Sequence, residues 1–143
     1  MRILLDTNVI SEFRKSGNAD RNVMAWAAGL RDEDVFLSVI SVFEIELGAR
    51  RIARRDERQA AMLRRWIDHQ ILARFSGRIL PFDVSVALRC AELHVPDPRR
   101  ERDALIAATA LVHGMVLATR NVADFRRTNV PIINPWDEPS APT

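Results

Sequence analysis

Four acidic residues of this chain are placed so that they could share one chemical task. Each lies where an apolar segment gives way to the start of a helix, and the four are Asp6, Glu44, Asp103 and Asp124. In an open parallel sheet the carboxyl ends of all strands lie along one edge, so residues that follow different strands converge there. The pattern therefore predicts a pocket that several carboxylates share.

A cation is expected in such a pocket, because crowded carboxylates repel one another and their pKa values rise unless a positive charge lies among them. Carboxylate oxygens are hard ligands and select Mg²⁺ or Mn²⁺. A metal ion held by few carboxylates keeps open positions, so it can polarise a phosphoryl oxygen and activate a water molecule for in-line attack. This is the chemistry of a metal-dependent nuclease.

The hypothesis gives the pocket six candidate residues, and these are Asp6, Glu44, Asp103, Asp124, Thr119 and Asn121. We expect Asp6 and Asp103 to bind the metal directly and the other two acids to bind it directly or through water. Thr119 and Asn121 would orient water or the scissile phosphate. Asp103 gives the strongest argument, because it heads a core-facing apolar stripe, where an unpaired carboxylate costs several kcal/mol.

Hydrophobic patterning predicts the elements that must position these residues. Short apolar runs typical of buried strands occur at residues 2–5, 35–40, 79–82, 115–119 and 132–133. Helical spacing, caps and breaks predict helices over residues 9–13, 23–30, 41–52, 59–75, 87–94 and 99–113, and a short one from Asn121. The alternation favours an α/β fold of three layers, with a mainly parallel sheet of about four to five strands flanked by helices.

The size and composition indicate one soluble domain. A chain of 143 residues supports a single core, which we place in residues 1–136, followed by a disordered tail at 137–143. No apolar run approaches the roughly 18 residues that a membrane helix needs, and an acid comes too early for a secretory signal. With a single cysteine, Cys90, no internal disulfide can form. We therefore expect a cytoplasmic protein that does not span a membrane.

Positive charge is unevenly distributed although the net charge is only +2. Seven arginines cluster in the middle of the chain, at positions 50, 51, 54, 55, 58, 64 and 65. Such a cluster would suit a nucleic-acid phosphate backbone. It would equally suit solvated helix faces, so both interpretations stay open.

Each acid also has a purely structural explanation, since Asp and Glu near helix starts satisfy free backbone N–H groups. Glu44 could complete a capping box with Ser41, and Asp124 stands in the same relation to Asn121. The three histidines share no metal-ligand spacing, and Cys90 lies on an apolar stripe. The scattered glycines form no phosphate-binding loop.

These residues together resemble the PIN-domain ribonucleases, in particular the VapC and FitB-like toxins of bacterial toxin–antitoxin pairs. The resemblance covers nearly the whole chain and is carried by segments 5–8 (LDTN), 44–48 (EIELG), 103–110 (DALIAATA), 119–125 (TRNVADF) and 134–136 (NPW). It implies an acidic pocket that binds Mg²⁺ or Mn²⁺ and cleaves RNA. It also implies a homodimer that is neutralised by a cognate antitoxin, which in turn binds operator DNA.

The sequence thus predicts a single-domain, metal-dependent endoribonuclease that acts as a toxin and hydrolyses RNA phosphodiesters through metal-activated water. One alternative is a Mg²⁺ phosphatase or phospho-accepting receiver, but these want a pocket lysine, and the only lysine is Lys15. Another is a catalytically weak binding module that acts with an antitoxin partner on operator DNA. The apolar stripes around Trp26 and Trp66 favour core packing, and they are also where we would place an interface with such a partner.

Overall fold

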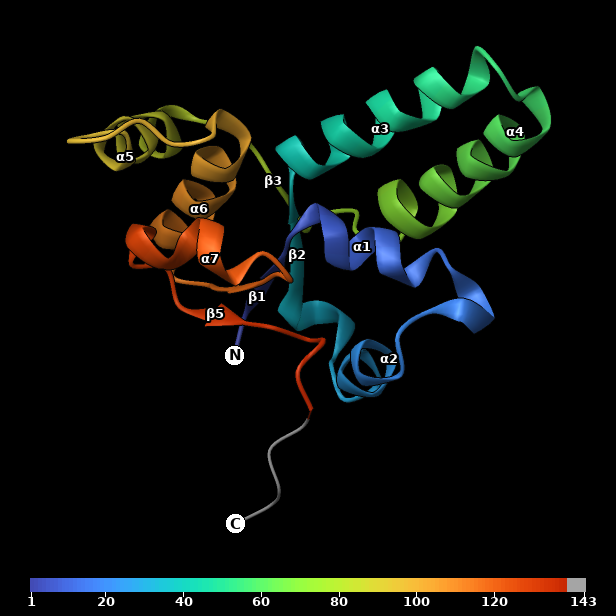
Figure 1. The fold of residues 1–143 in the computed structure, drawn as a ribbon, viewed down its shortest axis with the longest axis horizontal. Coiled ribbons are helices and arrows are strands. Elements are labelled where there is room, and N and C mark those ends of the chain that lie inside the picture. Colours follow the sequence, from blue (N-terminus) through green and yellow to red (C-terminus); the bar gives the residue numbers. More distant parts are fainter. Residues whose placement is uncertain (139–143) are drawn as a thin grey trace.

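The computed structural model describes residues 1–138, which contain a five-stranded parallel sheet in the order β3-β2-β1-β4-β5 (Figure 1). The strands are β1 (Ile3–Leu5), β2 (Val35–Ser38), β3 (Ile79–Leu80), β4 (Val116–Ala118) and β5 (Ile132–Ile133). Each matches one of the expected apolar runs, and the α/β prediction is confirmed. Most of the tail expected at 137–143 lies outside the described residues, and the domain boundary at residue 136 stays a prediction.

Helices fill the connections between the strands. They are α1 (Thr7–Phe13), α2 (Arg21–Ala28), α3 (Val39–Ala53), α4 (Glu57–Trp66), α5 (Val84–Leu93), α6 (Glu101–His113) and α7 (Val122–Phe125). A π-helix at Ile67–Ala73 extends α4, so the helix expected over 59–75 is present in two geometries. Short 3₁₀ turns occupy Ser16–Asn18, Asp32–Asp34 and Arg126–Thr128. Within residues 1–138, no helix is both long enough and apolar enough to cross a membrane.

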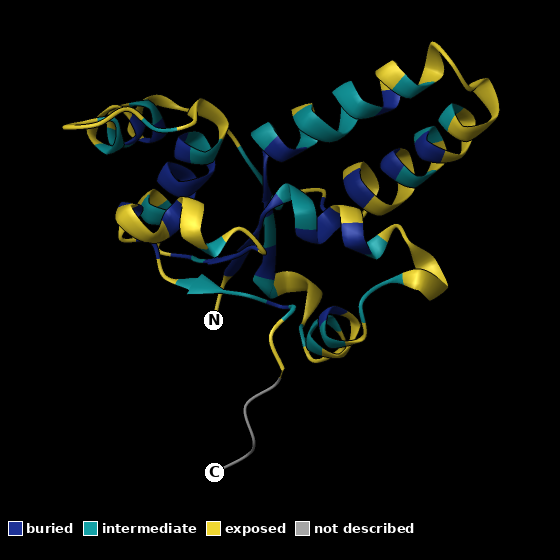
Figure 2. Cartoon of the chain, in the orientation of Figure 1, coloured by how far each residue is buried: buried dark blue, intermediate teal, exposed yellow. Residues whose placement is uncertain are grey.

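The sheet forms the middle of three layers. Side chains of β1 alternate between its faces: Ile3 and Leu5 pack in a core with α1, α3 and α4, whereas Leu4 packs in a second core with α6. All three are at most 1% exposed, as expected for a central strand covered on both sides. Figure 2 shows the buried residues gathered along the sheet, with the exposed ones on the outer helix surfaces.

The start of α3 differs from the sequence prediction. Ser38, rather than Ser41, caps the helix, because its hydroxyl oxygen accepts a hydrogen bond from the backbone N–H of Ile40 at 3.0 Å. The strand predicted over 35–40 therefore ends two residues early. β-branched residues continue past Ser38 and look strand-like in sequence, but the cap starts the helix there. The prediction of a capping box between Ser41 and Glu44 is therefore wrong.

The order of the strands brings distant ends of the chain together. β1 lies between β2 and β4, and Leu5 is in register with Ala118. The first and fourth strands of the chain are thus neighbours in the sheet. Residues that follow β1 and β4 meet at the same edge of the sheet.

Candidate acidic active site

Asp6 lies at the centre of the carboxyl edge, directly after β1. It is 5% exposed and caps α1: its Oδ1 accepts a hydrogen bond from Thr7 N at 2.8 Å. Its Oδ2 accepts from the Thr119 hydroxyl at 2.7 Å and from Asn8 Nδ2 at 3.3 Å. With hydrogen bonds on both oxygens, the carboxylate is fixed in position before any ligand arrives.

Thr119 follows β4 and links several parts of the site. Its side chain is fully buried, and its hydroxyl oxygen accepts a hydrogen bond from the backbone N–H of Asn121 at 3.0 Å while donating to Asp6. Its own backbone N–H donates to Ile133 O at 3.0 Å. Thr119 thus positions Asp6 and the turn that leads to α7.

Glu44 reaches the site from the second turn of α3. The Thr7 hydroxyl donates to Glu44 Oε1 at 3.0 Å and lies 3.0 Å from the hydroxyl of Ser41, which is fully buried. Since α3 begins at Ser38, Glu44 has no capping role, and the structural explanation considered for it is removed. Thr7 connects the two acids directly, because its backbone N–H donates to Asp6 and its hydroxyl donates to Glu44.

Asp103 lies in the first turn of α6 and does not follow a strand, contrary to the pattern that singled it out. It reaches the site because α6 precedes β4 and must run antiparallel to the sheet, which places its first turn over the carboxyl edge. Burial raises the pKa of Asp103, and the nearby charges of Asp124 and Glu44 raise it further, while Arg100 opposes them. Asp103 is therefore within electrostatic reach of both other acids.

Asp124 and Asn121 lie at the outer rim. Both are exposed, in or beside the short helix α7. The Asn121 side chain makes no cap hydrogen bond, so the capping explanation for this pair is not supported. Asp124 contributes its charge to Asp103, whereas Asn121 contributes its backbone N–H to Thr119.

The electrostatics of the cluster centre on Asp6, whose pKa is raised to about 6. Burial is the largest cause, and the charges of Asp103 and Glu44 add to it, against the lowering effect of the hydrogen bonds from Thr119 and Thr7. A carboxylate in this state is unfavourable near neutral pH unless a cation joins it. Asp6, Glu44, Asp103 and Asp124 are defined here as the acidic cluster.

The donor set of the acidic cluster fits a divalent cation, since its ligands are all carboxylate oxygens. A cation would offset both the burial and the acidic neighbours that raise the pKa of Asp6 and Asp103. Over residues 1–138, however, no three His, Cys, Asp or Glu side chains come together as a group that could hold a metal ion as they lie. The chemistry of the donor atoms therefore supports a metal ion, although the carboxylates of the described residues are not yet arranged around one point.

Arg102 is a site residue that the sequence analysis missed. Its Nη1 lies 3.7 Å from Glu44 Oε2, and its guanidinium lies 5.0 Å from the centre of the Phe43 ring. The signal was available, because Arg102 precedes Asp103 directly, but a single arginine in a charged run has no distinctive pattern. It supplies a positive charge at the edge of the acidic cluster.

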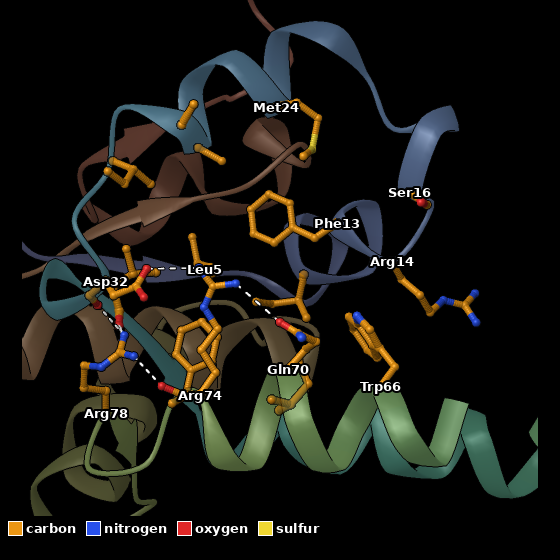
Figure 3. A pocket seen from close by; sticks show the side chains of 17 residues that line it. Leu5, Phe13, Arg14, Ser16, Met24, Asp32, Trp66, Gln70, Arg74 and Arg78 are labelled. Atoms are coloured by element: carbon orange, nitrogen blue, oxygen red, sulfur yellow. Dashed lines mark hydrogen bonds and ion pairs between the residues drawn. The ribbon is translucent and has the colours of Figure 1, made fainter. Parts of the chain in front are cut away.

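A separate cavity of about 630 Å³ lies between α1, α2 and the helix that runs from α4 into the π-helix. Figure 3 shows Phe13 and Met24 on one side and Trp66 and Gln70 on the other. Arginines 14, 74 and 78 also line it. Both tryptophans considered for interfaces pack against the main core, and Trp66 also lines this cavity.

The remaining candidates from the sequence lie outside the acidic cluster. Lys15 pairs with Glu12 at 2.8 Å beyond the end of α1, so the lysine that a phosphatase or receiver would need is engaged elsewhere. Cys90 is buried in a small core with α6, as expected. His94 Nδ1 accepts a hydrogen bond from Arg99 N at 3.0 Å, which is a structural contact.

Comparison with known proteins agrees with this architecture. Residues 3–131 match the PIN domain family. The chain is 38% identical to Toxin FitB of Neisseria gonorrhoeae, with 95% of this chain and 99% of that protein covered. It is 35% identical to VapC ribonuclease Y4jK of Sinorhizobium fredii, with 94% and 98% covered. A solved structure of FitAB bound to an IR36 DNA fragment superimposes with a TM-score of 0.87 at 38% identity, covering 96% of this chain and 98% of that one.

A parallel sheet in this order, with carboxylates gathered at its carboxyl edge, defines an α/β protein with an acidic site. The family match spans most of the chain, and the relatives match over nearly their full length. The chain belongs to the PIN domain family.

Proposed function

We propose that this protein is a divalent-metal-dependent endoribonuclease and the toxin of a toxin–antitoxin pair. The observation that carries the proposal is the acidic cluster, in which Asp6 is buried, fixed by hydrogen bonds and raised in pKa to about 6 by burial and by its acidic neighbours. The names of the relatives VapC ribonuclease Y4jK and Toxin FitB support the two halves of the proposal.

Asp6 and Asp103 would hold Mg²⁺ or Mn²⁺ directly, and Glu44 and Asp124 would hold it directly or through water. When bound, the metal would polarise the phosphoryl oxygen and lower the pKa of water at the site. The Thr119 hydroxyl keeps Asp6 in one rotamer, which spares the site reorganisation during the reaction.

The water oxygen would attack phosphorus as the bond from phosphorus to the leaving sugar oxygen breaks. The proton of the water must pass to a base, and Glu44 is the first candidate for that base. Its Oε1 accepts from the Thr7 hydroxyl, so Oε2 is the oxygen left for a proton, and Arg102 lies 3.7 Å from that atom. Asp124, exposed at the rim, is the second candidate base.

A cognate antitoxin would bind in the cavity between α1, α2 and the π-helix. The solved complexes of similar chains, FitAB bound to DNA and FitAcB from Neisseria gonorrhoeae, support a partner of this kind. The apolar lining from Phe13, Met24 and Trp66 suits an amphipathic segment, and the arginines that also line it suit acidic side chains on it. Operator DNA would be bound through the antitoxin. A homodimer and a cytoplasmic location remain part of the proposal.

A second candidate function is a binding module with weak catalysis, acting with its antitoxin on operator DNA. One observation favours it: the similar complex FitAB was solved on a DNA fragment. In this case an arginine of the partner would occupy the acidic cluster in place of a metal.

The two candidates separate in a cleavage assay. Protein stripped of any partner is incubated with mixed RNA and single-stranded DNA under Mg²⁺, Mn²⁺ or EDTA, beside Asp6→Asn. RNA cleavage that disappears with EDTA and with the variant supports the nuclease. Folded protein that binds Mn²⁺ and leaves every RNA intact supports the binding module.

A further inference from the structure

We propose that one face of α3 is the path by which single-stranded RNA enters the acidic cluster, with Arg51 and Arg55 holding its phosphates. The inference rests on the proposed nuclease function and names where its substrate lies. The RNA track is defined here as Arg102, Gly48, Arg51 and Arg55, in order of increasing distance from the site.

The outer part of the helical hairpin of α3 and α4 is strongly basic. Residues 50–65 contain seven arginines and two acids, a net charge of +5, whereas the full chain has a net charge of only +2. The remainder is therefore net −3, and it includes the acidic cluster. A polyanion would therefore be attracted to the segment of the hairpin formed by residues 50–65.

Two of these arginines are engaged by Glu46 within the hairpin. Arg64 Nη1 donates to both carboxylate oxygens of Glu46, at 2.7 and 2.8 Å, and joins α4 to α3. Arg50 Nε donates to the same carboxylate at 2.9 Å. Arg51 and Arg55 are exposed and form no ion pair with any described residue, so their charge is available to a ligand.

Helical geometry places the available charge on the face that carries Glu44. With 3.6 residues per turn, positions 44, 48, 51 and 55 fall on one stripe. Glu46, which contacts α4, lies on the other side of the buried face of α3, so α4 does not cover this stripe. Figure 1 shows the hairpin extending away from the sheet, with the start of α3 at the sheet and its end at the tip.

Gly48 leaves room on this stripe between the site and the arginines. A Cβ atom built at Gly48 would meet no atom within 4 Å, so the surface there is open and carries no side chain. A sugar-phosphate backbone can therefore pass close to the helix at this point. Arg102 lies at the site end of the same path, beside Glu44.

The dimensions suit a short stretch of RNA. At 1.5 Å rise per residue, Arg51 lies about 10 Å and Arg55 about 16 Å along the helix from Glu44. A stacked strand advances roughly 3.4 Å per nucleotide, so these arginines face phosphates about three to five nucleotides from the scissile bond. The track thus predicts a minimum substrate length on one side of the cut.

The test compares Arg51→Gln/Arg55→Gln with a matched control, Arg54→Gln/Arg58→Gln. The control removes the same charge from the same hairpin, but at exposed positions off the Glu44 stripe. Binding of a fluorescent 12-nucleotide RNA is measured by anisotropy at several salt concentrations, with Asp6→Asn in every protein to prevent cleavage. Circular dichroism melts of all variants confirm that they are folded.

We expect the track variant to lose on the order of tenfold in RNA affinity, and the slope of log affinity against log salt to fall by about 1.4, for two phosphate contacts on a single strand. The control is expected to lose less than about threefold. Equal losses in both variants, or no RNA binding by the parent protein, would overturn the track. Tighter binding of duplex DNA than of RNA, lost in the same variant, would overturn the assignment to RNA.

The same variants distinguish failure of the RNA track from failure of the proposed nuclease activity. In the proteins with Asp6 intact, the track predicts a higher KM with little change in kcat, because the arginines lie far from the reacting bond. If the parent protein cleaves no RNA but its RNA binding still depends on Arg51 and Arg55, the track stands and the nuclease fails. If cleavage is normal and KM is unchanged in the track variant, the nuclease stands and the track fails.

Discussion

The hydroxyl of Thr119 donates a hydrogen bond of 2.7 Å to the carboxylate of Asp6, although the two residues are 113 positions apart in sequence. The pairing of β1 with β4 brings them together, and burial of both side chains removes competition from water. This bond lowers the pKa of Asp6 against the opposing effect of burial. Its removal should therefore affect both the position and the charge of the central acid.

Thr119→Val is expected to lower kcat about tenfold and to destabilise the protein by about 1–2 kcal/mol. Val has the same shape as Thr, but it cannot donate the hydroxyl hydrogen bond to Asp6. The pKa of Asp6 should rise further, so the acid limb of the pH–rate profile should move to higher pH. Thr119→Ser keeps the hydroxyl and serves as the control. An unchanged pH profile in Thr119→Val would show that the bond does not tune Asp6.

The stability of the metal-free protein should depend on pH through Asp6. Its pKa is about 6 in the folded state against 3.8 in the absence of the fold, so between these values the folded protein holds a proton that the unfolded chain has released. Stability from this group therefore falls as pH rises from about 4 to 6 and stays lower above that. The penalty is on the order of 2–3 kcal/mol.

Asp6→Asn should remove that penalty, since Asn is neutral and can still cap α1. Urea unfolding in EDTA is expected to show the variant more stable than the parent at pH 7.5 and little different at pH 4. Excess Mn²⁺ should stabilise the parent but not the variant. If Asp6→Asn were less stable than the parent at pH 7.5, the unfavourable buried charge assigned to Asp6 would be contradicted.

Glu44→Gln should separate catalysis from capping. A capping role would make this change reduce helix stability, but α3 begins at Ser38, and Gln can still accept from the Thr7 hydroxyl. We expect kcat to fall about a hundredfold or more for loss of a general base, with thermal stability changed by less than about 0.5 kcal/mol. Ser38→Ala, in contrast, should cost about 1 kcal/mol of stability. The opposite pattern would restore the capping explanation.

Ala28→Arg should block the cavity proposed for the antitoxin. Ala28 is exposed at the end of α2 and lines the cavity, so a long side chain fills the space without disturbing the core. Ala25→Arg on the same helix is exposed outside the cavity and is the control. Native mass spectrometry of tagged protein from its own host is expected to show the small partner with the control and at least tenfold less with Ala28→Arg. Equal capture would place the partner elsewhere.

The sequence predicted the sheet and the position of Asp6 well, because a buried parallel strand is a continuous apolar run and the acid that ends it is unambiguous. It misplaced the start of α3, since Val39 and Ile40 favour strand geometry locally and only the Ser38 cap decides for the helix. It placed Asp103 on a core-facing stripe correctly, since Ile106, Ala107 and Ala110 are buried, but its position after a strand-like run is wrong. The correct reason is the direction of α6, which depends on tertiary packing.

Other features had a sequence signal too weak to predict them. Arg102 is one arginine in a charged segment, and its position beside Glu44 exists only once α3 and α6 have packed. The cavity between α1, α2 and the π-helix likewise arises from three separate segments, so hydrophobic stripes predicted exposed apolar surface but not its shape. The roles of the six site residues stay predictions until they are tested by substitution.

The most direct test of the account is single-turnover cleavage of a labelled RNA in Mg²⁺ by the parent protein, Asp6→Asn and Asp103→Asn. Asp97→Asn, an exposed acid in the loop before α6, is the control for loss of one negative charge. The account predicts that both site variants lose at least a hundredfold in rate while remaining folded, and that the control keeps the parent's rate. Metal-dependent cleavage that persists in both site variants would contradict it.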